Sequence, residues 1–300
     1  MTDGIDLTNR TEPIQQAIQG GRSLWDDAKA RLFRNKAAVT SMWILAILVI
    51  IAIIGPFVWV HDYRTITTSG ELSPTFENWH LLGTDEQGRD ILARLMIGLR
   101  ISLAVGLVAT IVSLIIGVTW GAVAGFVGGR VDNIMMRFVD VLYAMPFIFF
   151  VILLLTVFGR NIILIFAAIG AVEWLTMSRI VRGQTLAIKN KEFIEAARAT
   201  GVPFFTMIRR HVLPNVVGPV AVYVTLTIPV VIMAESFLSF LGLGVNEPLT
   251  SLGVLISQGA REMQDKPWML LAPALTMMIT LLCLNFIGDG LRDALDPKER

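Results

Sequence analysis

The sequence predicts an all-α protein that crosses a lipid bilayer several times. Of its 300 residues, 54% are hydrophobic and only 16% are charged, and the mean hydropathy is +0.67. A soluble chain of this length needs more charge on its water-facing surface. Six charge-poor stretches also approach or exceed the length of about 20 residues that a helix needs to cross the hydrocarbon layer. We therefore expect a polytopic membrane protein with six transmembrane helices.

The composition also excludes several functional classes. A net charge of +1 provides no basic field for nucleic acid. The single cysteine, Cys283, lies in an apolar stretch, which excludes a disulfide framework and a multi-cysteine metal site. The three histidines, His61, His80 and His211, share no ligand spacing. We therefore expect no bound metal and no redox chemistry.

The first 37 residues are polar and charged. Because no short apolar core follows Met1, we expect no secretory signal peptide. Ser23 followed by Asp26 predicts the start of a short helix. One stripe of this helix is apolar and the other face is charged, as in helices that lie in the headgroup layer. The apolar stripe consists of Leu24, Trp25, Ala28 and Leu32.

The six apolar stretches come next, each long enough to span the bilayer as a helix. The fourth is the shortest of them and contains Glu173. The stretches cover residues 38–60, 101–128, 134–158, 161–178, 214–240 and 268–288.

The distribution of Lys and Arg orients these helices, because short positively charged loops stay on the cytoplasmic side. With the N-terminus inside, 17 of the 25 basic residues fall on inner segments and six on outer ones, while Arg100 and Arg137 lie at the ends of helices. We therefore expect both termini in the cytoplasm. The predicted segments are 1–37 (cytoplasmic, with an interfacial helix), 38–60 (first helix), 61–97 (outer loop), 98–291 (a core of five helices) and 292–300 (cytoplasmic tail).

Small residues recur at every fourth position of the second stretch. Such a face lets another helix backbone approach closely, and we expect it to pack within the six-helix bundle rather than between subunits. No internal repeat is visible: Pro219 and Pro229 in the fifth stretch have no counterpart in the second, which argues against a carrier built from inverted repeats. The small residues are Ser113, Gly117, Gly121 and Gly125.

Three acidic residues lie in the apolar stretches, where an unpaired charge costs several kcal/mol. Asp140 is one turn away from Arg137, so we expect an ion pair between them. Glu173 and Glu235 have no such neighbour and are candidates for lining a translocation path. Glu235 is also close enough to the outer end of its helix to lie at headgroup level.

The outer loop contains a second amphipathic pattern. Thr84 and Gln87 have the spacing of a capping box at the start of a helix. This helix either rests on the membrane or helps to close an outer gate, and we favour the membrane surface because the apolar stripe suits it. The stripe consists of Ile91, Leu92, Leu95 and Met96.

The inner loop, residues 179–214, is too apolar for a freely solvated connector. Residues 192–200 predict a helix that Gly201 ends, and Pro203 suits the first turn of another helix. The small and charged residues of this loop suit a protein interface. Two helices lying on the headgroups explain the pattern equally well. The apolar stripe of the first helix consists of Phe193, Ile194 and Ala197.

Three short motifs of this loop have a characteristic spacing. The sequence Glu195-Ala196-Ala197 is followed four residues later by Gly201, and Leu213-Pro214 begins twelve residues after that glycine. This spacing resembles the EAA loop of ABC importer permeases, which seats a helix in a cleft of an ATPase subunit. His211 departs from the usual aliphatic residue, although peptide permeases resemble this chain there. The docking residues that the resemblance implies are Glu195, Ala196, Ala197, Arg198, Gly201, Leu213 and Pro214.

Further segments resemble the dipeptide, oligopeptide and nickel permeases. They are LGTDEQGRD at 82–90, SFLGLG at 239–244 and GDGLRDALDP at 288–297. The oligopeptide branch is similar in two more places, GRSLW at 21–25 and RIVRGQTL at 179–186. The chain is identified as a member of this family, most similar to the C-type permease subunits of oligopeptide importers.

This resemblance implies a permease in the inner membrane that imports oligopeptides by alternating access. It is not an enzyme and binds no cofactor, and ATP and Mg are used by its partners. The sequence agrees, because no Gly-Lys pair is present and a phosphate-binding loop needs one. The implied partners are a second homologous permease, two ATP-binding subunits, an extracytoplasmic peptide-binding protein and membrane lipid.

Two other functions are considered. Import of nickel or another small solute remains open within the same family, since these importers differ more in the binding protein than in the permease. An ion-coupled secondary carrier would use Glu173 and Glu235 as its coupling residues. An intramembrane enzyme has no support, because no nucleophile, base or metal constellation is recognisable at membrane depth.

Overall fold

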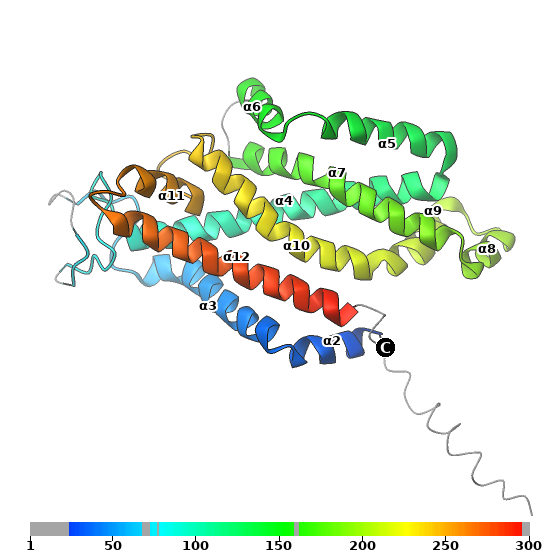
Figure 1. Cartoon of the computed structure of the whole chain (residues 1–300), viewed down its shortest axis with the longest axis horizontal. Coiled ribbons are helices and arrows are strands. Elements are labelled where there is room, and N and C mark those ends of the chain that lie inside the picture. Colours follow the sequence, from blue (N-terminus) through cyan, green and yellow to red (C-terminus); the bar gives the residue numbers. More distant parts are fainter. Residues whose placement is uncertain (1–23, 68–72, 77, 159–161, 296–300) are drawn as a thin grey trace, which may run out of the picture.

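The computed structural model describes residues 24–67, 73–76, 78–158 and 162–295. In these residues the chain is helical, with an isolated backbone bridge between Thr84 and Asp90. Figure 1 shows the long helices lying along the longest axis of the molecule, with short helices and loops at both ends. The all-α fold predicted from the sequence is confirmed for this part of the chain.

Within the described residues, five helices are long and apolar enough to cross a membrane. A sixth crossing exists if α5 (Gly129–Tyr143) and α6 (Phe147–Phe158) together form one span. The five helices are α3 (Lys36–Val58), α4 (Ile91–Val127), α7 (Ile162–Lys189), α10 (Leu213–Phe240) and α12 (Pro267–Leu295).

The third apolar stretch is not the continuous helix that the sequence predicts. The chain bends by 89° between α5 and α6. Ala144 ends α5, and Pro146 directly precedes α6. Proline lacks a backbone N–H and disfavours the helical conformation of the residue before it, so the helix stops here. Both short helices contact α7.

The small-residue face of the second apolar stretch packs α4 against α7. All four of its residues are buried. A Cβ atom at Gly121 would lie 2.4 Å from the Ser178 carbonyl oxygen, and one at Gly125 would lie 2.9 Å from the Arg182 carbonyl oxygen. The two backbones therefore approach too closely for any larger side chain. The predicted packing within the bundle is confirmed.

The predicted capping box at Thr84 and Gln87 is wrong. The Asp85 carboxylate accepts hydrogen bonds from the backbone N–H groups of Gln87 and Arg89, both at 2.9 Å, and holds this segment in a turn. A short acidic side chain bonds to nearby backbone in this way, in competition with helix formation. Helix α4 begins only after the turn, with Asp90 as its N-cap.

The apolar stripe at the start of α4 is inside the protein, so the predicted membrane-resting helix is also wrong. Leu95 forms a cluster with Ala52 of α3 and Leu252 of α11 (Leu252–Arg261), and half-buried Leu92 packs against the same cluster. Contacts with α3 and α11 therefore cover the N-terminal end of α4. The buried members of the stripe are Ile91, Leu95 and Met96.

The short helix α2 (Leu24–Arg34) confirms the N-terminal helix, although Ser23, its predicted cap, lies outside the described residues. It packs against α12, where Ala28 is buried and the Leu32 side chain lies beside Gly290. In Figure 1, α2 and the C-terminal end of α12 lie towards the end of the molecule that carries α8 (Glu192–Ala199), and α11 lies at the other end.

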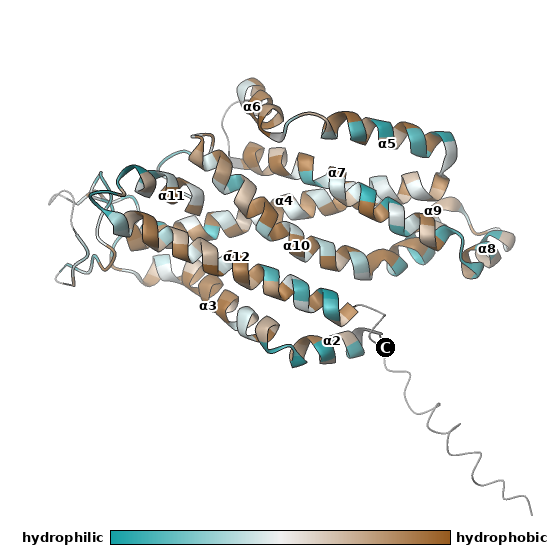
Figure 2. Ribbon diagram, in the orientation of Figure 1, coloured by the Kyte–Doolittle hydropathy of each residue, from teal (hydrophilic) through white to brown (hydrophobic). Residues whose placement is uncertain are grey.

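Large apolar side chains cover the outer surfaces of α3 and α12. Figure 2 shows these helices as mostly hydrophobic along their length, with hydrophilic residues gathered near their ends. Such a surface is unfavourable in water and suits contact with lipid tails. Its exposed side chains include Trp43, Ile47, Ile54, Leu271, Leu275 and Leu282.

Candidate coupling loop and translocation path

Helix α8, in the loop between α7 and α10, is closed by a glycine turn. Gly201 has φ +78°, a conformation that favours glycine. Its N–H donates to the Arg198 carbonyl oxygen at 3.0 Å, and the Val202 N–H donates to the Ala197 carbonyl oxygen at 3.1 Å. These two bonds form a Schellman motif. The predicted helix and its stop at Gly201 are confirmed to within one residue.

Two side chains anchor α8, and its other face is open. Ile194 is fully buried and Ala197 is nearly so, and both join a core cluster that includes Phe126 of α4. Phe193, predicted on the same stripe, is 43% exposed because it faces away from that cluster. The helix lies at one end of the bundle (Figure 1), and its open face carries small and charged side chains. Of the residues implied by the EAA resemblance, Glu195, Ala196 and Arg198 on α8 are exposed, as are Gly201 and Pro214 after it.

The second half of the loop leads directly into α10. Pro203 is the N-cap of α9 (Phe204–Met207), one position before the predicted first turn. A π-helical segment, Ile208–Val212, then joins α9 to α10, which begins with Leu213 and Pro214. An open surface cavity of about 530 Å³ is lined here by Phe205, Thr206, Arg209, Arg210 and Pro214.

Aromatic contacts connect this loop to the C-terminal end of α4. The Phe126 and Phe204 rings lie 5.6 Å apart between centroids. The Arg198 guanidinium carbon lies 5.9 Å from the centroid of the Phe126 ring, within the range of a cation–π contact. A force applied to α8 therefore reaches α4 directly.

Glu235 is fully buried where α4, α10 and α11 meet. Its carboxylate accepts hydrogen bonds from Ser239 Oγ at 2.6 Å and Ser102 Oγ at 3.2 Å. Ser102 Oγ in turn accepts one from the Leu252 N–H at 3.1 Å. These bonds attach α11 to the two long helices. The location fits neither a headgroup-level position nor a water-filled path, because the carboxylate is fully buried and hydrogen-bonded to Ser239 and Ser102.

Glu173 has a different environment. It lies on α7, is half-buried and lines a cavity of about 380 Å³. Tyr143 and Pro146, at the bend between α5 and α6, line the same cavity, as does Ala234 of α10. Among the described residues, no group forms a hydrogen bond or an ion pair with Glu173. Of the two predicted path residues, the structure places this one in a cavity.

Two ion pairs connect α5 to α7. Asp140 accepts a hydrogen bond from Arg179 at 2.7 Å, so the predicted pair with Arg137 is wrong. Arg137 is exposed, whereas Arg179 approaches Asp140 from the neighbouring helix. Asp132, which sequence reasoning missed, accepts two hydrogen bonds from Arg182, at 2.6 and 2.7 Å. Both pairs join residues about 40 to 50 positions apart, which helical spacing does not reveal.

A buried charge cluster lies at the opposite end of the bundle. The Asp85 carboxylate accepts hydrogen bonds from Arg94 and, at 2.8 Å, from Arg89. Arg89 also donates to Glu247 at 3.0 Å. The hydrogen bond from Arg89 lowers the pKa of the Glu247 carboxyl below its usual range. The cluster joins the start of α4 to the segment between α10 and α11.

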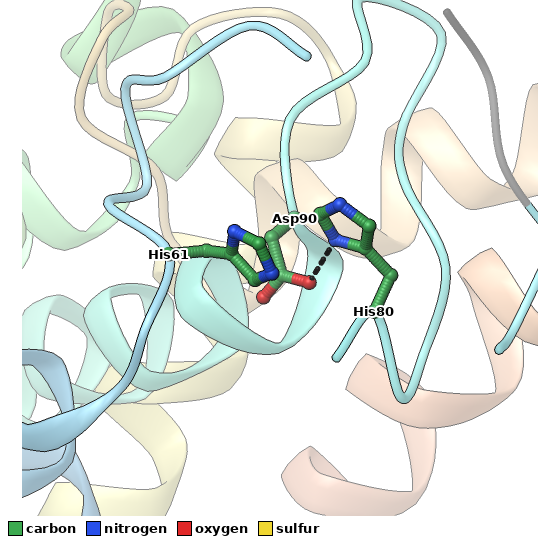
Figure 3. Close-up of side chains that lie close together, drawn as sticks. All are labelled: His61, His80 and Asp90. Carbon is green, nitrogen blue, oxygen red and sulfur yellow. Dashed lines mark hydrogen bonds and ion pairs between the residues drawn. The ribbon is translucent and has the colours of Figure 1, made fainter. Parts of the chain in front are cut away.

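His61 and His80 come together beside Asp90, although their spacing gave no reason to expect it (Figure 3). One possible ligand atom from each residue lies within 4.8 Å of the other two. His80 Nδ1 lies 2.8 Å from Asp90 Oδ1, and the other Asp90 oxygen accepts hydrogen bonds from Trp59 Nε1 and the Ala93 N–H. Asp90 therefore connects the loop to the end of α3 and the start of α4.

This arrangement does not fit a metal site as it stands. The two imidazole rings are stacked, with centroids 4.0 Å apart and planes 15° apart. An imidazole nitrogen binds metal through a lone pair in the ring plane, and two nearly parallel planes cannot share one ion beside both rings. The His61 nitrogen Nε2 already lies 2.8 Å from the Asn78 carbonyl oxygen. The cluster supports the N-cap of α4 instead.

Comparison with known proteins places the chain in a family. Residues 117–300 match the binding-protein-dependent transport system inner membrane component, and residues 23–74 match the N-terminal transmembrane domain of oligopeptide transport permease C. The oligopeptide transport system permease protein OppC of Haemophilus influenzae is 55% identical over 96% of this chain and 93% of its own length. OppC of Escherichia coli K12 is 54% identical over 93% of each chain.

More distant relatives are consistent with this family. The dipeptide transport system permease protein DppC of Bacillus subtilis is 45% identical over 93% of this chain and 87% of its own length. A chain from an inward-facing structure of the MetNI methionine ABC transporter aligns with a TM-score of 0.57 and 18% identity, over 69% of this chain and 96% of that chain. At that identity the likeness concerns the fold. The chain therefore belongs to the family of inner membrane components of binding-protein-dependent transport systems, and its relatives at 54–55% identity are oligopeptide permeases.

Proposed function

We propose that this chain is the permease subunit of an ATP-driven importer that takes up oligopeptides by alternating access. The observation that carries the proposal is α8, a short capped helix that exposes Glu195, Ala196 and Arg198 at one end of the bundle. Relatives that are 54–55% identical over nearly the whole chain are oligopeptide permeases, which favours peptide over nickel as cargo.

In the proposed mechanism, α8 is the coupling helix between this chain and an ATP-binding subunit. Its burial through Ile194 and Ala197 makes it a rigid lever on the end of α4. Closure of two ATP-binding subunits on ATP would move α8, tilt the long helices and expose the central path to one side and then to the other. ATP and Mg would be handled by these subunits.

The remaining parts of the assembly follow from the same proposal. The chain would cross the inner membrane six times, with α5 and α6 as one broken crossing and both termini in the cytoplasm. A second, homologous permease would complete the path. A peptide-binding protein would deliver cargo to the outer end, where α11 and the Asp85 cluster lie.

The test is purification of the chain, tagged at its C-terminus, from gently solubilised native membranes, followed by mass spectrometry. Recovery of two ATP-binding subunits and a second permease is expected, and a co-purifying binding protein would identify peptide or nickel as the cargo. Recovery of the chain alone, with transport that survives ATP depletion, would contradict the proposal and favour a secondary carrier.

The docking role of α8 is tested separately with Gly201→Asp and Glu195→Lys. A Cβ atom at Gly201 meets nothing within 4 Å, so the aspartate strains only the left-handed turn, by about 1–2 kcal/mol. We expect both variants to insert and fold but to lose the ATP-binding subunits on purification. Gly183→Ala, also in open space but in ordinary helix, is the control and should retain them. Normal peptide transport by the two α8 variants would show that α8 is not the coupling helix.

A further inference from the structure

One face of α7 lines two cavities in succession. Glu173 and Thr176 line the cavity of about 380 Å³ near the bend, and Ile180 and Gln184 line a second one of about 550 Å³. The spacing of these four residues, i, i+3, i+7 and i+11, places them on one stripe of the helix. The opposite face of α7 carries Ser178, which packs against α4. The stripe therefore marks the hollow side of α7.

Tyr223 of α10 connects the two cavities. It lines the second cavity, and its side chain is hydrogen-bonded to Thr176 of the first and lies within electrostatic range of Glu173. The second cavity extends to Arg292, near the end of α12. Together the cavities form a row beside α7 from the middle of the helix towards the end that carries α8. This course is suitable for a solute that crosses the protein.

Glu173 is the acidic residue in the first cavity, and no described residue forms a hydrogen bond or an ion pair with it. A carboxylate at this depth costs several kcal/mol unless water or a cation compensates it. Tyr143 and Phe150 also line the cavity, and aromatic faces attract cations. The site thus combines one carboxylate with aromatic and apolar walls, and it favours a positively charged solute.

The chemistry of the walls distinguishes an organic cation from a metal ion. Calcium takes six to eight oxygen ligands, and magnesium takes six in octahedral geometry. Here the Glu173 carboxylate and the Thr176 hydroxyl are surrounded mainly by apolar groups. A metal ion would lose most of its water ligands, and the cavity has too few oxygen atoms to replace them. An ammonium group needs one charged acceptor, and its carbon skeleton gains from an apolar wall. A volume of about 380 Å³ lies in the range of small-molecule sites.

We propose that Glu173 binds the ammonium group of the transported peptide as it passes along α7. This inference rests on the proposed function and adds the group that the path recognises. Two sources supply the same chemistry: the α-amino terminus of the peptide or a lysine side chain. The aromatic walls hold the residue that carries the ammonium.

The first experiment measures protection of Glu173 in the complete purified transporter without nucleotide. A hydrophobic carbodiimide modifies the carboxyl, and mass spectrometry measures the modified fraction of Glu173. We expect a pentapeptide with a free amino terminus and no lysine to reduce modification. The same peptide with an acetylated amino terminus should not reduce modification. An acetylated peptide with one lysine distinguishes the two sources, because it reduces modification only if Glu173 also binds a lysine side chain. Equal modification in all arms would overturn the proposal.

The second experiment measures ATP-dependent peptide uptake in proteoliposomes with all subunits and the binding protein. Loss of a charge-assisted hydrogen bond predicts that Glu173→Gln lowers kcat/KM about tenfold or more. Glu173→Asp, which keeps the charge, should recover part of it. Asp293→Asn, an exposed acid on α12, is the control and should match the wild type. Unchanged uptake by Glu173→Gln would overturn this inference alone, whereas no ATP-dependent peptide uptake by the wild type would overturn the proposed function.

Discussion

At the scale of single residues, two ion pairs on the same pair of helices differ in burial. The Asp132 side chain is 7% exposed and forms a bidentate ion pair with Arg182. The Asp140 side chain is 61% exposed and forms one hydrogen bond with Arg179. Solvent screens the exposed pair, so it contributes little to the free energy of folding. The Asp132 carboxylate is buried, so water cannot take the place of Arg182 if the pair is broken. The Asp132 pair is therefore the one that fixes α5 on α7.

We predict that Asp132→Asn destabilises the folded protein by about 1–3 kcal/mol, because it removes a buried, charge-assisted pair. The matched control, Asp140→Asn, should cost less than about 1 kcal/mol. Thermal unfolding of both variants in the same detergent gives the comparison. Equal losses of thermal stability would show that burial does not distinguish the two pairs.

The same contrast explains which residue roles were predictable. The stop at Gly201 depends on local backbone conformation, and the sequence around it determines that conformation. The partner of Asp140 depends instead on which helix lies beside α5, so the nearest arginine in the sequence was the wrong one. Glu235 and Glu173 are both acids in apolar stretches, and their difference arises from neighbours on other helices.

At the scale of elements, contact between α4 and α7 limits the size of the side chains between them. We predict that Gly121→Ala destabilises the protein, since its Cβ would lie 2.4 Å from a backbone oxygen and the helices must separate. Overpacking of this kind costs about 1–3 kcal/mol, more than the gain of up to about 1 kcal/mol from helix propensity.

Gly183→Ala on α7 is the matched control. Nothing lies within 4 Å of its Cβ position, so only the gain in propensity remains. Thermal unfolding should show a lower midpoint for Gly121→Ala and an unchanged or higher one for Gly183→Ala. A stabilised Gly121→Ala would mean that the two helices are not in close contact.

Hydropathy predicted the long helices because each of them must be apolar along its own length, whatever surrounds it. It did not predict α11 or the start of α4 at Ile91, since tertiary contacts stabilise these segments. Ser251 caps α11 by accepting a hydrogen bond from the Val254 N–H at 3.2 Å, and this serine was the local signal for the helix. The sequence also contains a local indication of the bend between α5 and α6, because Pro146 interrupts a continuous helix there.

At the scale of the whole molecule, the two ends of the bundle have different roles in the proposed importer. Hydrogen bonds and ion pairs tie the end with α11 together, through Asp85, Arg89 and Glu247 on one side and Glu235 on the other. The other end carries α8, held by two apolar side chains. In the proposed importer, the outer end would stay rigid, and α8, packed on α4 through Ile194 and Ala197, would transmit the movement of the ATP-binding subunits from the cytoplasmic side.

The orientation of the bundle is tested with two cysteines of similar exposure, in a Cys283→Ala background. Phe76 is 87% exposed in the predicted outer loop, and Phe205 is 82% exposed in the predicted coupling loop. In right-side-out membrane vesicles, a membrane-impermeant maleimide should label Phe76→Cys at once. Phe205→Cys should react only after the vesicles are opened. Labelling in the reverse order would invert the proposed topology, and labelling of both before opening would place the two loops on the same side.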